Sequence, residues 1–284
     1  MVREFKLLNE KGQSYSLMDI QNYCLLTEPN GLGYSYSTEY EQLGSTFIEN
    51  FRRVEQGQIA GTVNFINYDN YKKLIDFIEK SEELKIAYKI PFENSSKEYL
   101  KDIEIQSITK TQKQTNGIIS ESITFNCLSL WYEQNTVTYE IELETNEIRW
   151  DFKWDSRFKE YNSKSIEYKN EGHIEAPILL EINGPVINPQ IEIYINSELY
   201  QKVQFKTEIQ SYEKLLYSSR QNDFYINKQK TDGTIESLFN LDVIEFANDN
   251  VVRLPKNIAC EIRIKAENTI QSAILTILPQ YFAV

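Results

Sequence analysis

The single histidine, His173 in the stretch NEGHIEAPI, is the first residue whose chemistry could serve catalysis. An imidazole titrates near neutral pH, so it can transfer protons or bind a metal ion. With one histidine in the chain, a metal site with several histidine ligands is excluded. The sequence also contains no GxSxG nucleophile motif, P-loop or GxGxxG fingerprint. We therefore expect a structural or surface role for His173, and a protein with no enzymatic activity, cofactor or metal.

Paired carboxylates are a second chemical possibility, because two of them can hydrolyse a glycosidic bond. The most regular set is Glu140, Glu142 and Glu144 in YEIELE, which would share one face of a strand. A glycoside hydrolase needs one selected pair, with one member in a pocket that raises its pKa. Nothing in the sequence selects such a pair. The pattern is typical of a solvated strand face, and a hydrolase is disfavoured.

Three cysteines, Cys24, Cys127 and Cys260, are the only thiols. Their number is odd and no two have CxxC spacing, so neither a zinc motif nor a disulfide framework is indicated. Each lies in an apolar, strand-like context. We expect small buried residues of a protein from a reducing compartment.

The charge of the chain limits its partners. The formal net charge is −12, spread along the sequence, and no cluster of Lys and Arg suggests a surface that binds nucleic acid. No apolar run reaches the length of a membrane span. The first residues, MVREFKLLNEKG, contain no apolar stretch like that of a secretory signal, so neither membrane anchor nor signal is expected.

The elements that would position these residues are mostly strands. Tyr and Phe are abundant at 19 and 14, Gly and Pro are scarce at 10 and 7, and alternating segments recur along the chain. One helix is expected over 69–80, with Asp69 as its N-cap and an amphipathic stripe that includes Tyr71 and Leu74. Asn116-Gly117 indicates a hairpin turn. The segment 212–221 fits a short helix or a strand equally well.

The two strand series meet near EQNT, so the predicted domains are 1–133 and 134–284. The first contains the helix, and the second contains strands with turn dipeptides at 183–184 and 232–233. No tandem repeat or low-complexity segment occurs. The fold class predicted is therefore mostly β, with two domains and one amphipathic helix in the first.

The longest unusual stretch runs from Gly33 to Phe65 and alternates like a strand pair. Tyr34, Tyr36 and Tyr40 share one parity in its first half, and Phe47, Phe51 and Val54 supply the apolar positions of its second half. Gly44 could form a turn or a bulge between the two halves.

A compact aromatic cluster, EIRWDFKWDSRF at 147–158, places Trp150, Phe152 and Trp154 on one parity of a strand with charged residues on the other. Three interpretations remain open. The strip packs into a core or between domains, as most such residues do, or it contacts another subunit, or it stacks against sugar rings.

Six segments follow one another along the chain: REFKLLNEKGQSYSL at 3–17, GLGYSYSTEYEQLGSTFIENFRRVEQGQIAGTVNF at 31–65, YDNYKKLIDFIEKSEELKIAYKIP at 68–91, EIRWDFKWDSRF at 147–158, GHIEAPILLEINGPVINPQI at 172–191 and LPKNIACEIRI at 254–264. As an ordered set they resemble the distal tail protein (Dit) family of siphoviruses, phages with long non-contractile tails. The match is one of organisation and order, because none of these segments is a catalytic motif.

The resemblance implies an N-terminal ring-forming, tail-tube-like β domain and a C-terminal galectin-like or jelly-roll β-sandwich. It implies a hexameric ring in the tail tip or baseplate of a phage or prophage virion, made in the bacterial cytoplasm. Such a ring joins the tail tube protein to the tail-associated (fibre) protein and can dock a receptor-binding protein for host attachment. DNA would pass through without binding, and the acidic balance suggests a negative central opening.

Under this resemblance the alternating stretch becomes the candidate subunit interface. The residues expected to carry it are Tyr34, Tyr36, Tyr40, Phe47, Phe51 and Arg53. Aromatic side chains supply contact area, and amides and hydroxyls satisfy hydrogen bonds at the rim of an interface. The plainer interpretation is a hairpin within one sandwich. The alternative function is a free-standing carbohydrate-binding β-sandwich protein, which would be monomeric.

Overall fold

The computed structural model describes residues 3–19, 24–89, 97–110, 114–115, 117–140, 165–239, 244–247, 251–268, 270 and 272–284. These residues form two compact units, Met1–Glu133 together with Tyr281–Val284, and Gln134–Gln280. The prediction of a mostly β protein is confirmed, with one α-helix among the described residues. The last four residues join the first unit, whereas the sequence suggested an uninterrupted second domain to residue 284.

The first unit is built on a large antiparallel sheet whose main strand order is β2-β1-β8-β9-β11-β7-β4-β3. Its members are β1 (Glu4–Asn9), β2 (Ser14–Ser16), β3 (Met18–Asp19), β4 (Cys24–Asn30), β7 (Gln58–Phe65), β8 (Leu84–Lys89), β9 (Glu98–Ile108), β10 (Gln114–Thr115), β11 (Ile118–Cys127), β12 (Trp131–Tyr132) and β27 (Gln280–Tyr281). A hairpin turn was expected at 116–117. Thr115 of β10 pairs with Ile118 of β11, and Gly117 has a φ of 80°, while Asn116 lies outside the described residues.

Alternation along these strands creates the core of the first unit. On β11, Ile119, Ile123 and Phe125 are buried, and the residues between Ile119 and Ile123 include the exposed Ser120 and Ser122. This period-two pattern follows from the pleat of a strand, which sends successive side chains to opposite faces. The helix covers the inner face of the sheet.

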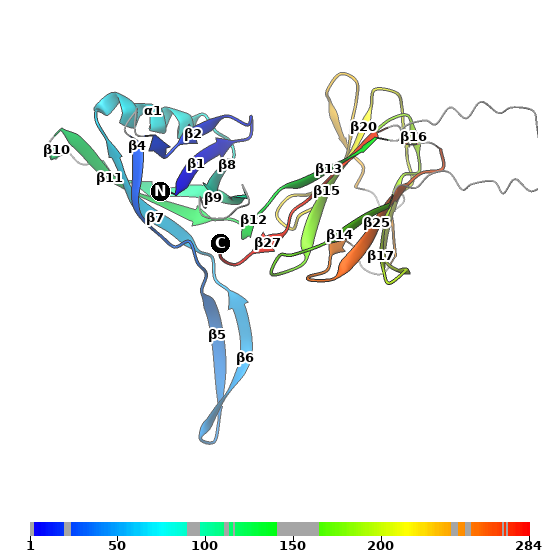
Figure 1. Cartoon of the computed structure of the whole chain (residues 1–284), viewed down its shortest axis with the longest axis horizontal. Coiled ribbons are helices and arrows are strands. Elements are labelled where there is room, and N and C mark those ends of the chain that lie inside the picture. Colours follow the sequence, from blue (N-terminus) through cyan, green and yellow to red (C-terminus); the bar gives the residue numbers. More distant parts are fainter. Residues whose placement is uncertain are drawn as a thin grey trace, which may run out of the picture. The chain divides into compact units, whose positions relative to one another are not determined.

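The helix α1 (Tyr68–Glu79) begins one residue before the expected start, and its N-cap is Asn67. The Asn67 side-chain oxygen accepts a hydrogen bond from the Asn70 backbone N–H at 3.0 Å. Asp69 was expected as the cap but lies in the first turn, where a carboxylate interacts well with the helix dipole. The Tyr71 ring meets Phe65 edge-on at 5.6 Å, which joins the helix to β7 (Figure 1).

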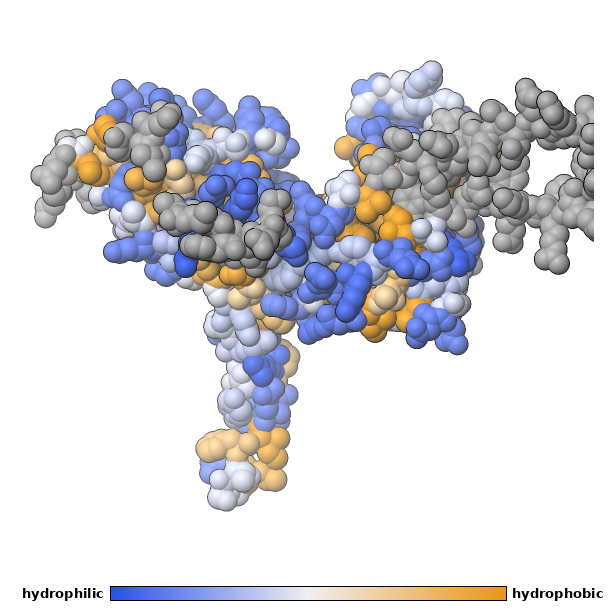
Figure 2. Space-filling model, viewed as in Figure 1, coloured by the Kyte–Doolittle hydropathy of each residue, from blue (hydrophilic) through white to orange (hydrophobic). Residues whose placement is uncertain are grey.

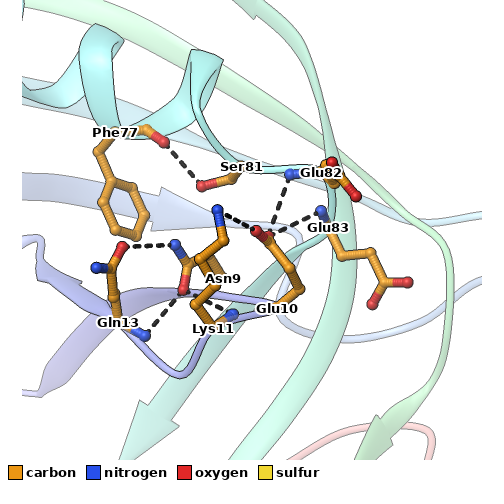
Figure 3. Close-up of polar contacts among 8 residues, drawn as sticks. All are labelled: Asn9, Glu10, Lys11, Gln13, Phe77, Ser81, Glu82 and Glu83. Atoms are coloured by element: carbon orange, nitrogen blue, oxygen red, sulfur yellow. Dashed lines mark hydrogen bonds and ion pairs between the residues drawn. The ribbon is translucent and has the colours of Figure 1, made fainter. Parts of the chain in front are cut away.

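A polar contact ties the β1–β2 turn to the segment after the helix (Figure 3). Asn9 closes the turn, since its side-chain oxygen accepts from the backbone N–H of Lys11 at 3.1 Å. Glu10 accepts from the backbone N–H groups of Glu82 and Glu83 at 3.1 and 3.4 Å. The pKa of Glu10 is lowered, first by a hydrogen bond from its own backbone and then by those from Glu83 and Glu82, although partial desolvation opposes them.

The second unit contains two larger sheets that share one hydrophobic core. The first has the order β13-β26-β15-β20-β21-β22, with β24 pairing to β15, and the second has the order β14-β25-β17-β18-β23. Their bounds are β13 (Asn135–Glu140), β14 (Ser165–Lys169), β15 (Ala176–Asn183), β17 (Gln190–Ile195), β18 (Glu198–Phe205), β20 (Lys214–Ser219), β21 (Phe224–Gln229), β22 (Ile235–Ser237), β23 (Ile244–Ala247), β24 (Arg253–Leu254), β25 (Ala259–Lys265) and β26 (Ser272–Ile277). A small pair, β16 (Val186–Ile187) and β19 (Glu208–Ile209), completes it.

The core of this unit again follows from alternation. Ile191 and Ile193 of β17 pair with Ile264 and Ile262 of β25, and all four are buried. The segment 212–221, which fitted a helix or a strand, contains the strand β20 (Lys214–Ser219). Tyr217 of this strand is fully buried. The galectin-like character of this unit stays a prediction.

Candidate functional site: a projecting β-hairpin

The most unusual element of the first unit is a hairpin of β5 (Tyr36–Leu43) and β6 (Thr46–Val54). The two strands form a sheet of their own and pair with no other strand in the described part of the chain. Figure 1 shows them projecting from the body of the unit as an arm. Strands of this length span about 25–30 Å at ~3.3 Å per residue. Gly44, with a φ of 64°, lies in the turn between them, one of the two roles expected for it.

A β-bulge divides the apolar residues of the arm between its two faces. Glu39 pairs with Phe51, but Tyr40 pairs with Glu49, so Asn50 is an extra residue on β6. Tyr40 and Phe47 therefore share one face, and Phe51 lies on the other. The sequence placed Phe47 and Phe51 in one alternating series, and the inserted residue reverses their relationship.

Large apolar side chains are exposed on both faces of the arm. The set consists of Tyr34, Tyr40, Leu43, Phe47, Ile48 and Phe51. The extreme case is Phe47, which retains 69% of its accessible surface. Figure 2 shows hydrophobic side chains gathered at the end of the arm, beyond a more hydrophilic middle. Exposed apolar surface of this extent marks an interaction site more often than a free surface.

Aromatic packing holds the base of the arm. The Tyr34 ring lies 5.2 Å from Tyr36 and 5.2 Å from Phe282, measured between centroids. The Arg52 guanidinium carbon lies 3.7 Å from the centre of the Tyr36 ring, a cation–π contact. Tyr34 and Tyr36 are thus engaged within the subunit, while Arg53 is exposed on the opposite face from Arg52.

The chain enters the arm through a tightly fixed segment. Gly31 has a φ of 78°, and a Cβ atom there would lie 1.7 Å from the backbone oxygen of Gln58. The next residue, Leu32, accepts a hydrogen bond from the Trp131 indole N–H at 3.0 Å. Where the chain leaves the arm after β6, the Gln56 side-chain amide donates a hydrogen bond to the Cys127 backbone oxygen at 3.2 Å. These contacts direct the arm away from the sheet.

The outward face of β4, β7, β9 and β11 carries hydroxyl and amide groups. The Gln58 amide donates to Gln106 and Asn126 at 2.9 and 3.1 Å, and the Ser120 hydroxyl donates to Asn64 at 2.6 Å. The result is a ladder of uncharged polar side chains across neighbouring strands.

Charge is scarce on that face. Lys101 is the single basic residue within the four strands, and it is buried beside the Trp131 ring, where desolvation lowers its pKa. Glu28 and Glu104 are the exposed charged residues of these strands. The ladder therefore offers no exposed Lys or Arg to an anionic polymer.

The residues with catalytic potential do not form a site in the described parts of the chain. His173 is exposed in the second unit, and its backbone N–H donates to the Gln280 oxygen at 2.7 Å. Cys24, Cys127 and Cys260 are buried free thiols, and burial raises the pKa of each, to about 11 for Cys24. No group of three or more His, Cys, Asp or Glu side chains suited to a metal ion occurs among the described residues.

Some expected residues lie outside the described part. The aromatic strip Trp150, Phe152 and Trp154 is among them, as are Glu142 and Glu144. Within the described residues, no helix combines the length and apolarity that crossing a membrane requires.

Comparisons of the sequence identify a matching family model and two similar proteins. The family model described as the N-terminal domain of the distal tail protein matches residues 4–128. The distal tail proteins of Lactococcus phages SK1 and p2 are 25% and 24% identical to the chain over 146 residues. Each alignment covers 49% of this chain and 49% of the relative, so about half of each protein is matched.

Solved structures share the fold over a longer range. A chain of the phage P2 baseplate, in its activated conformation with calcium, has a TM-score of 0.68 at 18% identity and covers 100% of both chains. The SPP1 Dit protein, whose structure is described as a paradigm of the hub adsorption apparatus in phages that infect Gram-positive bacteria, has a TM-score of 0.55 at 10% identity. That match covers 96% of this chain and 98% of the other. These findings support the resemblance seen in the sequence: residues 4–128 match the N-terminal domain of the distal tail protein family, and the fold of the chain is that of phage baseplate and Dit structures.

Proposed function

We propose that the chain is a hub component of a phage or prophage tail tip, and that six copies form a ring through the β5–β6 arm. The observation that carries the proposal is the arm itself, an isolated hairpin with large apolar side chains exposed on both faces. A hairpin of two strands has marginal stability in water, so an arm of this kind gains stability when a partner covers it.

The geometry of the arm favours self-association of a head-to-tail type. The arm leaves one end of the unit and its apolar end points away from the body (Figures 1 and 2). Contact between an arm and a different surface of the next copy is heterologous, and heterologous contacts generate rings when the rotation closes. Within the ring, the residues proposed to contact a neighbour are Tyr40, Phe47, Phe51 and Arg53, while Tyr34 and Tyr36 support the arm from its base.

The match of residues 4–128 to the N-terminal domain of the distal tail protein supports the remaining parts of the proposal. The ring joins the tail tube protein to the tail-associated (fibre) protein and serves host attachment, with a receptor-binding protein as a further partner. The first unit forms the ring, the second is a galectin-like β-sandwich, and the protein acts in the virion after synthesis in the bacterial cytoplasm. The role is structural, without enzymatic activity, metal or cofactor.

The passage of DNA through the ring is consistent with the polar face of β4, β7, β9 and β11, which exposes no Lys or Arg. The sequence suggested a negative opening, and the exposed charged residues of these strands, Glu28 and Glu104, are acidic and lie among amides and hydroxyls. A wall of amides and hydroxyls without exposed Lys or Arg gives DNA phosphates no ionic partner. We propose that this face lines the opening, so that DNA passes through without binding.

The test measures molar mass by light scattering across a concentration series, followed by negative-stain imaging. The wild-type chain should form a six-fold ring with an open centre. Phe47→Ser/Phe51→Ser should remove apolar contacts from both faces of the arm and shift the mass toward the monomer, and Tyr212→Ser, at a residue that is 85% exposed in the second unit, is the matched control. A ring that persists unchanged in the arm variant would contradict the role of the arm.

A further inference from the structure

A lysine lies in the core of the first unit beside a cysteine. Lys101 of β9 retains 3% of its accessible surface, and Cys127 of β11 retains 6%. Lysine is seldom buried unless a carboxylate pairs with it. Asp102, the next residue in the sequence, points to the other face of the strand, where it accepts a hydrogen bond from the Tyr132 hydroxyl at 2.8 Å. We propose that Lys101 and Cys127 form a modification site, in which hydrogen peroxide drives a covalent bond between the lysine nitrogen and the cysteine sulfur.

The strand register places the two side chains on one face of the sheet. Cys127 pairs with Ile103 across β11 and β9, so these two residues point to the same side. Lys101 precedes Ile103 by two residues and therefore shares its face. Lys101 is thus the diagonal neighbour of Cys127, at about 7–8 Å between Cα atoms, a separation that a lysine side chain can span.

The surroundings of the lysine nitrogen are apolar. Lys101 Nζ lies 4.7 Å from the centre of the Trp131 ring. Desolvation lowers the pKa of Lys101, while its interactions with Cys127, which include a hydrogen bond from the ammonium group to the sulfur, oppose that shift. Burial therefore favours the neutral amine, which is the nucleophilic form of lysine.

Cys127 differs from the other two thiols of the chain. Burial raises the pKa of Cys24, Cys127 and Cys260. Among the described residues, a basic side chain opposes this effect at Cys127 alone, where Lys101 acts through its charge and its hydrogen bond. Because peroxide oxidises the thiolate, Cys127 is the thiol that should react first.

A glycine covers the sulfur of Cys127 from the side of the arm. A Cβ atom added at Gly57 would lie 3.7 Å from the Cys127 sulfur, which is an ordinary contact distance. With no side chain at Gly57, the backbone alone covers the sulfur on that side. Hydrogen peroxide is little larger than water, so a small local opening gives it access to the thiol.

The first step of the reaction forms a sulfenic acid. The Cys127 sulfur attacks hydrogen peroxide, the O–O bond breaks and an S–O bond forms. The amine of Lys101 accepts the thiol proton and passes it to the departing hydroxide, which leaves as water. The sulfur is oxidised in this step, and the peroxide is reduced.

The second step joins the two side chains. The neutral amine of Lys101 attacks the sulfenic sulfur, so that an S–N bond forms and the S–O bond breaks. The hydroxyl group leaves as a second water with one proton from the amine. One thiol, one amine and one hydrogen peroxide thus give one sulfenamide and two waters.

The new bond would lie at the base of the arm. The Cys127 backbone N–H donates to the Gly57 oxygen at 2.9 Å, just after the chain leaves β6. The Trp131 indole, beside Lys101, donates to the Leu32 oxygen at 3.0 Å, just before the chain enters β5. A bond between Lys101 and Cys127 would therefore fix β9 to β11 where both ends of the arm are attached.

The two compartments that a virion meets would set the timing of this bond. Thiols stay reduced in the bacterial cytoplasm, and oxidation follows release of the assembled particle. The bond would then stiffen the base of the arm after assembly. This timing rests on the proposed function, whereas the reaction itself does not.

Peptide mass spectrometry of the full chain, treated with hydrogen peroxide and digested without reductant, tests the proposal. One pair of peptides should be joined through Lys101 and Cys127. The joined pair should be about 2 Da lighter than the sum of the free peptides, because a sulfenamide has two hydrogens fewer than the thiol and the amine. Dithiothreitol should release both peptides at their original masses.

Three variants make the test specific. Cys24→Ala/Cys260→Ala, in which no disulfide can form within the chain, should give the same joined pair. Lys101→Leu, which keeps the site apolar, should leave Cys127 to gain about 16 or 32 Da as a sulfenic or sulfinic acid. Gly57→Ala should slow the reaction, since the added methyl group covers the sulfur.

Two results in the wild type would overturn the proposal. One is a Cys127 that stays a thiol, or becomes a sulfinic acid, without any joined pair. The other is oxidation of Cys24 and Cys260 to the same extent as Cys127, which would show that Lys101 does not select its neighbour. Neither result bears on the proposed ring, because the ring is detected by molar mass and imaging.

Discussion

The Tyr34 ring packs against Phe282, with 5.2 Å between ring centroids, although the two residues come from opposite ends of the chain. Tyr281–Val284 belong to the first unit, and Tyr281 also meets Tyr99 edge-on at 5.5 Å. The last residues of the chain therefore return to the N-terminal unit and support the base of the arm. The segment Tyr281–Val284 follows the second unit in the sequence, yet it packs in the first unit and supports the base of the arm there.

Replacing Phe282 with Ala should loosen the base of the arm without unfolding the sheet. The ring contacts to Tyr34 and Tyr36 would be lost, at a cost of about 1–2 kcal/mol in the free energy of unfolding. Hydrogen exchange should show faster exchange in the base of β5 and β6, while β11 keeps its protection. Phe282→Tyr keeps the ring and serves as the control, and unchanged exchange in the arm would show that Phe282 does not support it.

Gly31→Ala should be one of the most destabilising small substitutions in the first unit. The φ of 78° strains any residue with a Cβ, and that atom would overlap the Gln58 backbone oxygen. Gly12 provides a matched control, because its φ is 72° but nothing lies within 4 Å of the added atom. We expect about 1 kcal/mol for Gly12→Ala from the backbone alone and at least ~3 kcal/mol for Gly31→Ala. Urea unfolding measures both, and equal losses would argue against the close approach.

Local patterns in the sequence predicted much of this fold, because alternation and amphipathic periodicity are local consequences of burial. The apolar stripe of α1 is an example, and the N-cap was misplaced because Asn67 and Asp69 are both good capping residues. The bulge at Asn50 could not be predicted, since one extra residue in a polar strand leaves no local signal. The Tyr34–Phe282 contact was also beyond prediction, because it joins distant segments through packing alone.

The alternating pattern of the sequence indicated the arm but not the full set of residues at its surface. Tyr40, Phe47 and Phe51 are exposed as an interface would need, whereas Leu43 and Ile48 were missed although they are also exposed. An aliphatic residue in an alternating strand is usually part of a core, so its exposure shows only when the fold reveals that no second layer covers the hairpin. Arg52, which packs on Tyr36, was missed in favour of its neighbour Arg53, because the pairing register of the two strands decides which arginine lies on the face of Tyr36.

Glu10→Gln should make the free energy of unfolding of the first unit less sensitive to acidification. The folded state lowers the pKa of Glu10 through backbone hydrogen bonds to the ionised carboxylate. Its contribution to stability is present above the pKa of the unfolded chain, about 4.3, and is lost as the pH falls through the folded value. The wild type should therefore lose more stability than Glu10→Gln on acidification from pH 6 to pH 3. Thermal unfolding at a series of pH values measures the difference, and Glu39→Gln, on the exposed arm, is the control.

Tyr217 should control the alkaline stability of the second unit. Its side chain is fully buried, its hydroxyl oxygen accepts a hydrogen bond from the Val252 backbone N–H at 3.2 Å, and burial raises its pKa to about 12. The unfolded chain ionises this tyrosine near pH 10, so the unfolded state holds fewer protons than the folded state between those values. Stability must then fall as the pH rises from about 10 to 12, by ~2–3 kcal/mol for this group.

The variant Tyr217→Phe separates this effect from that of the other tyrosines. At pH 7 it leaves the Val252 N–H without its acceptor and should cost about 1–3 kcal/mol. Phenylalanine cannot ionise, so the variant should lose less stability than the wild type above pH 10, and the two unfolding curves should converge near pH 12. Urea unfolding followed by circular dichroism at pH 7, 10 and 11.5 measures the gap. A gap that stays constant over this range would show that Tyr217 ionises in the folded protein as readily as in the unfolded chain.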